Sequence, residues 1–426
     1  MLAAGNYGSI GINGRNYASG VTLQSAVSGQ AHIDGLTIQN SSNLSFSGLD
    51  LGRAAGTTPP DSVQLNWVKT SSNINFNEVT FHGSLDNDPS NDGVGLYAIG
   101  VSGLKVANCT FTQLFRGLAI TGSSNVSVQS NDFHDLRSDG TVVSSTDGIS
   151  IDGNSYSNFH PNATDHADAI QFWNTGQTKG SSNITIKDNV LMQPDPVPPG
   201  GVQGIFISDP LTYGYKNILI QNNVLYSNGA YNGITVFGAD GVQIIGNTVT
   251  SVSNDSKNYW IRLDTDSNIT VRDNVTDNIL IGTLTNSSIE NNVNFLSTPA
   301  LRAQISHLDN PASAADLVLP GTGYHVPVTT PLAPVAGAVG SGISGFLETS
   351  LGSSISKLLV ADSSSQTLNM SGLKDALVSA APVAEASAPA PAAPPVIALE
   401  APMEVHHWAG YHVADSRFVE SFTALP

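Results

Sequence analysis

Residues 204–223 contain the pattern that decides the fold of this chain. Residues 204–207 are Gly-Ile-Phe-Ile, residues 217–220 are Asn-Ile-Leu-Ile, and Asn223 follows three positions later. In both phrases apolar residues alternate with residues of any type, which is typical of a short strand that buries one face. No helical pattern separates the two phrases, so they do not form the strand–helix–strand unit of an ordinary parallel sheet.

Both phrases recur along the chain, which indicates a repeat protein. The first phrase, Gly-apolar-any-apolar in most copies, begins at residues 95, 117, 148, 169, 204, 233 and 260, and the second, Asn/Gly-apolar-any-apolar, begins at residues 43, 73, 103, 125, 183, 217, 241 and 268. Short strands at such a period predict coils that stack on one another. Asparagine at a fixed corner suits a left-handed turn and can hydrogen-bond to its counterpart in the next coil.

We therefore predict an all-β fold, a right-handed parallel β-helix with a non-repetitive C-terminal extension. The β-helix is expected to span residues 1–296, followed by an irregular segment, 297–380. Residues 381–400 are rich in proline and alanine and should form an extended linker. The tail, 401–426, should dock back on the body. The side chains expected to point into the helix are Ile149, Ile151, Ile170, Phe172, Ile205, Ile207, Ile234 and Val236.

The composition excludes several classes of protein. A net charge of −18 with only 16 Lys and Arg argues against nucleic-acid binding, which requires clustered basic residues. No stretch approaches the ~20 apolar residues of a membrane span, so no membrane insertion is expected. The chain has one cysteine, Cys109, which excludes an intrachain disulfide. It opens at Met1 without a visible signal peptide, so we expect that a leader has been trimmed.

The densest group of reactive side chains lies in residues 165–173, on the outward face of one predicted coil. His166 would serve as a general base near neutral pH, and Asp168 would orient it or act as an acid. Gln171 would hydrogen-bond a substrate carboxylate, and Trp173 would offer a flat face to a sugar ring. The alternative is a polar turn before a strand, in which His166 bonds to a loop carbonyl.

Asp147 and Asp168 each directly precede a copy of the first phrase, so the alignment of coils stacks them about 4.8 Å apart. Two carboxylates at this distance share a proton or bind a cation. Paired carboxylates are also the catalytic residues of glycosidases. The alternative is that each only caps a turn. Arg262, with Asp264 beside it, points outward further along the same face. It would neutralise a uronate; otherwise the two form a surface salt bridge.

The remaining candidates would bind substrate from the same face or from loops beside it: Arg116, Lys187, Tyr213 and Tyr215. The tail histidines His406, His407 and His412 lack the spacing of a metal site. The chemistry requires no cofactor, although Ca²⁺ would suit as a bridge between an acidic protein and an acidic polymer. Neither metal ligands nor an oligomeric state follow from the sequence.

The repeat over about residues 30–296 resembles the right-handed parallel β-helix enzymes that act on carbohydrates. These include pectate, alginate and chondroitin lyases, polygalacturonase-type hydrolases and mannuronan epimerases. Residues 145–148, Ser-Thr-Asp-Gly, resemble the Asn-Thr-Asp-Gly motif of polygalacturonases, and residues 167–168, Ala-Asp, fall where that family has Asp-Asp. Residues 203–205 lack the histidine of its Gly-His-Gly motif, and residues 261–263 match its Arg-Ile-Lys motif poorly.

This resemblance implies a lyase that cleaves an acidic, uronate-containing extracellular polysaccharide by β-elimination, for example one of the sphingan type. Such a protein would be secreted, periplasmic or on the cell surface. A lyase needs a base for the C5 proton, a group that stabilises the enolate and an acid for the leaving oxygen. These roles would fall to His166, to Arg262 or Gln171, and to Tyr213 or Tyr215. Alternatives are a polygalacturonase-type hydrolase that uses Asp147 and Asp168, an epimerase, and a non-catalytic carbohydrate-binding or structural β-helix.

Overall fold

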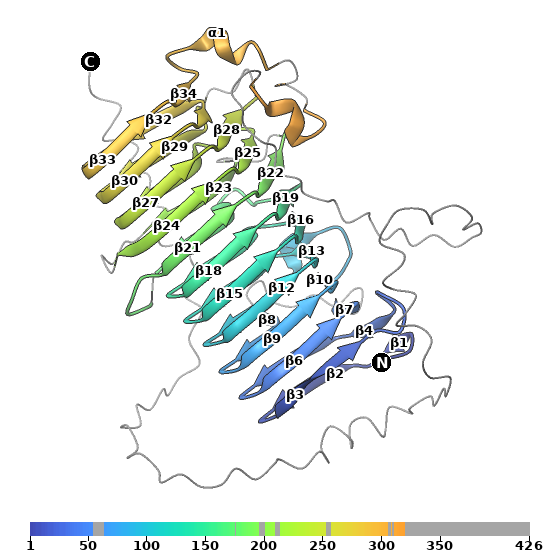
Figure 1. Cartoon of the computed structure of the whole chain (residues 1–426). Helices are drawn as coiled ribbons and strands as arrows, with labels where there is room; N and C mark the ends of the chain where they lie inside the picture. Colours follow the sequence, from blue (N-terminus) through green and yellow to red (C-terminus); the bar gives the residue numbers. More distant parts are fainter. Residues whose placement is uncertain are drawn as a thin grey trace, which may run out of the picture. The chain divides into compact units, whose positions relative to one another are not determined.

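The computed structural model describes residues 1–53, 64–174, 176–195, 201–208, 214–252, 257–305, 308 and 311–319. Their strands pair in parallel into three sheets of 12, 11 and 11 strands. Neighbours in each sheet are three strands apart in the sequence, so each coil adds one strand to every sheet. The coils follow one another along a single stack (Figure 1). The prediction of a parallel β-helix is therefore confirmed, whereas the predicted linker, 381–400, and tail, 401–426, lie outside the described residues.

The sheets are named I, II and III here. Sheet I consists of β1 (Gly5–Asn6), β4 (Ala31–Ile33), β7 (Leu49–Gly52), β10 (Thr80–His82), β13 (Thr110–Leu114), β16 (Asp132–Leu136), β19 (Ser155–Ser157), β22 (Val190–Gln193), β25 (Val224–Ser227), β28 (Thr248–Ser251), β31 (Val275–Thr276) and β34 (Val293–Asn294). Sheet II consists of β2 (Ser9–Asn13), β5 (Gly35–Gln39), β8 (Gln64–Lys69), β11 (Val94–Ile99), β14 (Arg116–Thr121), β17 (Thr141–Ser144), β20 (Ala167–Trp173), β23 (Val202–Ser208), β26 (Asn232–Phe237), β29 (Trp260–Asp264) and β32 (Asn278–Ile281). Sheet III consists of β3 (Asn16–Gln24), β6 (Ser42–Ser47), β9 (Ser72–Asn77), β12 (Ser102–Ala107), β15 (Ser124–Gln129), β18 (Asp147–Asp152), β21 (Ser182–Lys187), β24 (Tyr215–Gln221), β27 (Ala239–Ile245), β30 (Asp266–Arg272) and β33 (Leu284–Glu290).

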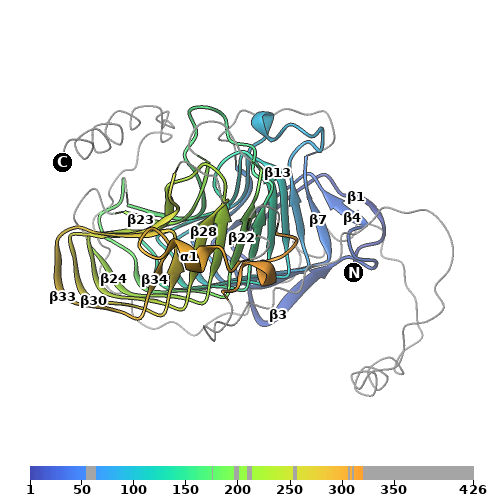
Figure 2. The ribbon, with the colours of Figure 1, turned by 90° about the horizontal axis from the view of Figure 1, so that it is seen from above.

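The core runs along the inside of the stack, where equivalent strands of successive coils line up (Figure 2). All eight side chains predicted to point inward are at most 3% exposed. The rings of Phe81, Phe111, Phe133 and Tyr156 stack in series with centroid separations of 4.7, 4.6 and 4.9 Å. These separations match the spacing between neighbouring strands, about 4.8 Å, so each coil places its ring directly on the one before.

Asparagines connect the coils at two corners, as the sequence predicts. The asparagines that open the second phrase adopt left-handed backbone conformations, with Asn183 at φ 55° and Asn217 at φ 54°. The asparagines that follow this phrase are buried and bond from coil to coil. Asn154 donates from its backbone and side chain to Asn189 Oδ1 at 3.0 and 2.9 Å, and the same contacts recur along the stack. At this second corner the left-handed residue is the one before the asparagine, such as Asp188.

The chain after β34 returns to sheet I. Tyr226 donates its hydroxyl to the carbonyl of Leu308 at 2.6 Å, and Arg302 donates to the carbonyl of Ser251 at 3.0 Å. Leu317 is buried in the same apolar cluster as Tyr226. The short helical segments are η1 (Pro89–Asn91), α1 (Pro299–Arg302) and η2 (Ala314–Leu317). Within the described residues, none of the helices has the length and apolar character needed to span a membrane.

Candidate active site

The predicted alignment of coils is wrong in one coil. β18, which begins at Asp147, pairs with β15 and β21 in sheet III, so residues 148–151 are a copy of the second phrase. The strand that this coil contributes to sheet II is β17, in which Thr141 pairs with Ile170 of β20. Asp147 and Asp168 therefore lie on different sheets, and the predicted carboxylate pair does not exist. Asp147 is exposed and accepts hydrogen bonds from Ser182 and Asn183.

The correct alignment of this coil could not be recognised in the sequence, because a polar residue occupies a core position. Gly140 follows Gly117 by 23 residues, close to one coil, but the next residue is Thr141 where other copies of the phrase have an apolar side chain. Thr141 is fully buried, and its hydroxyl is 3.2 Å from the hydroxyl of Tyr156. The core accepts this threonine because its polar group is hydrogen-bonded.

Asp139 occupies the position that Asp147 was predicted to hold. Its carboxylate accepts hydrogen bonds from Nε of Arg116 at 2.7 Å and from the backbone N–H of Asp168 at 3.1 Å. Asp139 is 1% exposed and Asp168 is fully buried. Arg116, predicted to bind substrate, is thus committed to an ion pair that balances one of two buried carboxylates.

His166 is the exposed member of the cluster. Its Nδ1 lies 2.9 Å from Oδ2 of Asp168, and its Nε2 lies 2.8 Å from Nε2 of Gln203. The imidazole is 28% exposed, whereas Asp168 beneath it is completely covered. Because the Gln203 amide nitrogen only donates, Nε2 is the unprotonated nitrogen of a neutral ring, and Nδ1 donates to Asp168. This is the arrangement of a base held by a carboxylate.

Burial raises the pKa of Asp168 to about 6, although His166 and the side chain of Gln171 stabilise the ionised form. The neighbouring carboxylate of Asp139 acts in the same direction as burial. Gln171 is 6% exposed and donates to Asp168 Oδ2 at 2.8 Å. In this structure its amide holds Asp168, and its contact with a substrate carboxylate stays a prediction.

An aromatic row continues from His166 along sheet II. The ring of Phe206 contacts His166 edge-on at 5.1 Å and stacks with Trp173 at 6.5 Å. Phe237 follows on β26, 6.5 Å from Phe206, and the guanidinium of Arg262 lies over Phe237 at 5.0 Å. The structure thus brings the predicted residues His166, Trp173 and Arg262 to one face and joins them through two phenylalanines.

Residues 67–249 match a family model described as the right handed beta helix region. The chain is a right-handed parallel β-helix. No curated protein matches its sequence. Among solved structures it is similar to the A-module of the mannuronan C-5 epimerase AlgE6 of Azotobacter vinelandii, at 15% identity over 69% of this chain and 89% of that chain, with a TM-score of 0.44.

Two further structures show the same kind of likeness. One is PfbA, a surface adhesin of Streptococcus pneumoniae, at 11% identity over 68% of this chain and 71% of that chain, with a TM-score of 0.42. The other is a mannuronic acid specific family 6 polysaccharide lyase from human gut microbiota, at 12% identity over 68% and 72% of the two chains, with a TM-score of 0.39. The match to the family model and the three parallel sheets confirm the predicted resemblance to right-handed parallel β-helix proteins at the level of the fold.

Of the other predicted residues, Lys187 and Tyr215 lie on sheet III, whereas Asp264 lies on sheet II beside Arg262. Lys187 ends β21 in sheet III and forms an ion pair with Asp152 at 3.0 Å. Tyr215 is fully buried and donates its hydroxyl to the carbonyl of Ser208, so its predicted contact with substrate is wrong. Asp264 ends β29 on sheet II and accepts from the backbone of residue 283. Tyr213 lies outside the described residues.

Three residues that the sequence analysis did not select complete the site: Gln203, Asn232 and Trp260. The indole of Trp260 donates to Asn232 Oδ1 at 2.9 Å, and Asn232 donates to Gln203 Oε1 at 2.5 Å. Gln203 in turn reaches His166. Gln203 and Asn232 directly precede copies of the first phrase, as Asp168 does, so their position in the repeat was the available signal.

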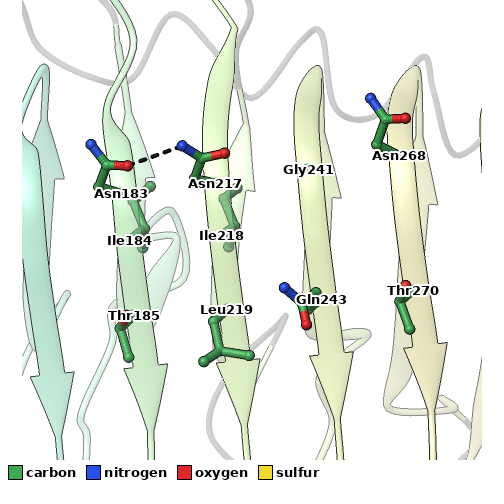
Figure 3. Close-up of a pocket in the computed structure, with 10 residues that line it drawn as sticks. All are labelled: Asn183, Ile184, Thr185, Asn217, Ile218, Leu219, Gly241, Gln243, Asn268 and Thr270. Carbon is green, nitrogen blue, oxygen red and sulfur yellow. Dashed lines mark hydrogen bonds between the residues drawn. The ribbon is translucent and has the colours of Figure 1, made fainter.

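A hollow of about 480 Å³ lies on sheet III, over β21, β24, β27 and β30 (Figure 3). Corner amides line one part of it, with Asn217 donating to Asn183 at 3.0 Å, and Thr185, Leu219 and Gln243 line another. None of the residues that line it carries a titratable side chain. The hollow can contact a polymer through amides and hydroxyls, but it supplies no acid or base.

Proposed function

We propose that the β-helix is a polysaccharide lyase that cleaves an acidic, uronate-containing polysaccharide by β-elimination. The observation that carries the proposal is the partly exposed His166, bound to a buried carboxylate and flanked by the aromatic row that starts at Phe206. An imidazole held in this way is suited to remove a proton from carbon. Because a polymer of this kind lies outside the cell, the proposal also implies a secreted or surface location.

In the proposed step, His166 Nε2 takes the proton from C5 of the uronate. The electrons of the C5–H bond form the C4–C5 double bond, the C4–O bond breaks, and the leaving oxygen takes a proton from solvent. Asp168 stabilises the imidazolium that forms, as a carboxylate bonded to Nδ1 does in other His–Asp pairs. Gln203 occupies the Nε2 side of the ring, so substrate must displace its amide.

Arg262 belongs to a neighbouring subsite in this proposal. β29 is three strands from β20 in sheet II, which corresponds to about 14 Å at ~4.8 Å per strand. That separation exceeds the reach of a single sugar ring from His166. Arg262 would therefore bind the carboxylate of another uronate along the chain of the polymer, and Asp264 beside it would restrict which charges are accepted there.

Hydrolysis by two carboxylates is less well supported. A glycosidase needs both carboxyl groups at the scissile bond, one on each side. Asp147 lies on sheet III, and the adjacent pair that does exist, Asp139 and Asp168, is buried. Neither member of that pair presents an oxygen to a bound sugar.

The function is tested by incubating the chain with a panel of uronate polymers and following the ultraviolet absorbance of the unsaturated product. A lyase produces this absorbance together with new chain ends. An epimerase exchanges the C5 proton with solvent and leaves the chain length unchanged. A hydrolase produces new chain ends without the unsaturated uronate, and either of these last two results would contradict the proposal.

The rate should rise with pH as the coupled pair of His166 and Asp168 loses its proton, because His166 must be unprotonated to act as the base. Only the carboxylate form stabilises the imidazolium, so turnover falls on the acid side. The free energy of unfolding should change with pH in the direction opposite to the rate. The pKa of Asp168 is raised from 3.8 to about 6 by folding, so the native state binds the proton more tightly and loses stability as the pH rises between those values. Rate profiles and thermal unfolding at several pH values check both trends, and Asp168→Asn should remove the trend in stability.

Trp173→Ala should raise KM about 3- to 10-fold and change kcat little, because a stacking surface holds the ground state and the transition state alike. Trp173→Phe retains a flat ring and should keep most of the affinity. Steady-state kinetics on the best polymer of the panel measures both variants. A fall in kcat with an unchanged KM in Trp173→Ala would instead assign the indole to the chemical step.

A further inference from the structure

We infer that His32, Asp50 and His82 form a binding site for a divalent transition-metal ion of the Zn²⁺ type. The three side chains come from three successive strands of sheet I, β4, β7 and β10. One potential ligand atom from each lies within 4.8 Å of the other two. The site is on a different sheet from His166, so the inference does not depend on the proposed function.

The distances suit a shared ion. Nδ1 of His32 lies 2.8 Å from Oδ2 of Asp50, and Nε2 of His82 lies 3.1 Å from Oδ1 of the same carboxylate. Zinc bonds to nitrogen and carboxylate oxygen measure about 2.0–2.2 Å, which places neighbouring ligand atoms of a tetrahedral site about 3.3 Å apart. A small relaxation of the side chains would therefore admit the ion.

In each imidazole ring, the nitrogen that does not face Asp50 already contacts a hydrogen-bond acceptor. Nδ1 of His82 lies 2.7 Å from the carbonyl oxygen of Gly83, which can only accept, so Nδ1 carries a proton and Nε2 is the nitrogen left to bind a metal ion. Nε2 of His32 lies 3.1 Å from Asp34, which also accepts from Asn6. Bonds of this kind orient imidazoles that bind metals.

His82 provides an independent observation. The residue is 3% exposed, and its Nε2 is buried without a hydrogen bond even though it is directed toward Asp50. A lone pair that faces a carboxylate is repelled unless a proton or a metal ion lies between them. Gly52 makes this placement of the ring possible, because a Cβ there would lie 2.4 Å from the imidazole.

The donor set favours zinc over calcium. Two imidazoles and one carboxylate are the ligands of borderline transition metals, whereas Ca²⁺ prefers six to eight oxygens. His32 and Asp50 are partly exposed, so the ion has a route of entry and a fourth position for water. Once bound, it would join three coils near the first end of the stack and raise their stability.

The test is titration of the full chain with Zn²⁺ alone, followed by calorimetry and thermal unfolding. We expect one strongly bound ion, a higher melting temperature with zinc, and weaker binding on acidification, because protons compete for the imidazoles. Asp50→Asn should lower the affinity at least tenfold, as should the milder change His32→Asn, whose side chain is more exposed. Circular dichroism verifies that both variants fold.

His160→Ala is the matched control. His160 lies 3.3 Å from Asp135 in another His–Asp cluster, but its side chain is 47% exposed. Zinc affinity should be unchanged in this variant, and Ca²⁺ should not replace zinc. Absence of zinc binding by the unmodified chain would overturn the inference and leave a set of proton-mediated His–Asp contacts. Equal losses in His160→Ala and Asp50→Asn would overturn it as well, since they would indicate adventitious surface binding.

Discussion

His166→Ala should reduce turnover on a uronate polymer by about 10²- to 10⁴-fold, the usual range for the loss of a positioned base. The fold should be retained, because the residue precedes β20 and contributes little to the core. Initial rates of the unsaturated product measure the loss, and KM should change less than kcat. Asp168→Asn should cause a loss of similar order, since the neutral amide cannot stabilise an imidazolium.

Two controls separate this mechanism from its alternatives. His160→Ala removes a more exposed imidazole six residues earlier in the sequence and should leave turnover unchanged. Asp147→Asn should also have little effect, because Asp147 lies on sheet III. If Asp147→Asn abolished activity while His166→Ala retained it, the lyase proposal would be wrong and the chemistry would belong to another face of the β-helix.

Asn189→Ala should destabilise the β-helix by about 3 to 5 kcal/mol, since it removes buried hydrogen bonds and leaves a small cavity. Asn189 accepts from the backbone N–H and the side chain of Asn154 and donates to the carbonyl of Ile151 and to Asn223. The N–H of Asn154 would lose its acceptor inside the stack. Chemical denaturation monitored by circular dichroism measures the change.

Asn183→Gly is the control for this prediction. Asn183 is an exposed corner residue at φ 55°, and Gly148 and Gly241 occupy the same corner in other coils. Its replacement by glycine should change stability by less than about 1 kcal/mol. If the two variants were equally destabilised, the buried asparagines would not be the connections that hold the coils together.

The fold could be predicted because the same two phrases recur many times along the chain, and alternation alone identified the inward face of Ile205 and Ile207. His166, Asp168 and Trp173 could be found because they are close in sequence. Asp139 could not, because Thr141 replaced an apolar residue in its phrase. The interpretation depended on that single position, since one misassigned phrase moved Asp147 to the wrong sheet.

The remaining differences come from contacts between coils. Gln171 was predicted to bind a substrate carboxylate because its side-chain amide can donate hydrogen bonds. Only the structure shows that this amide donates to Asp168. The cluster of His32, Asp50 and His82 was not predicted, because the strands of sheet I follow no phrase that recurs clearly. Its members also do not share one register position, since β10 aligns Thr80, rather than His82, with Asp50.

The parallel stacking of sheet II sets the spacing of the subsites along the polymer that the β-helix is proposed to bind. His166 and Arg262 belong to coils whose order along the axis is the order of the sequence. Inserting or deleting one coil between β20 and β29 would move Arg262 by one strand spacing, about 4.8 Å, and leave the contacts of His166 with Asp168 intact. Subsite spacing in such a protein can therefore change by duplication of a sequence repeat, in fixed steps and independently of the catalytic group.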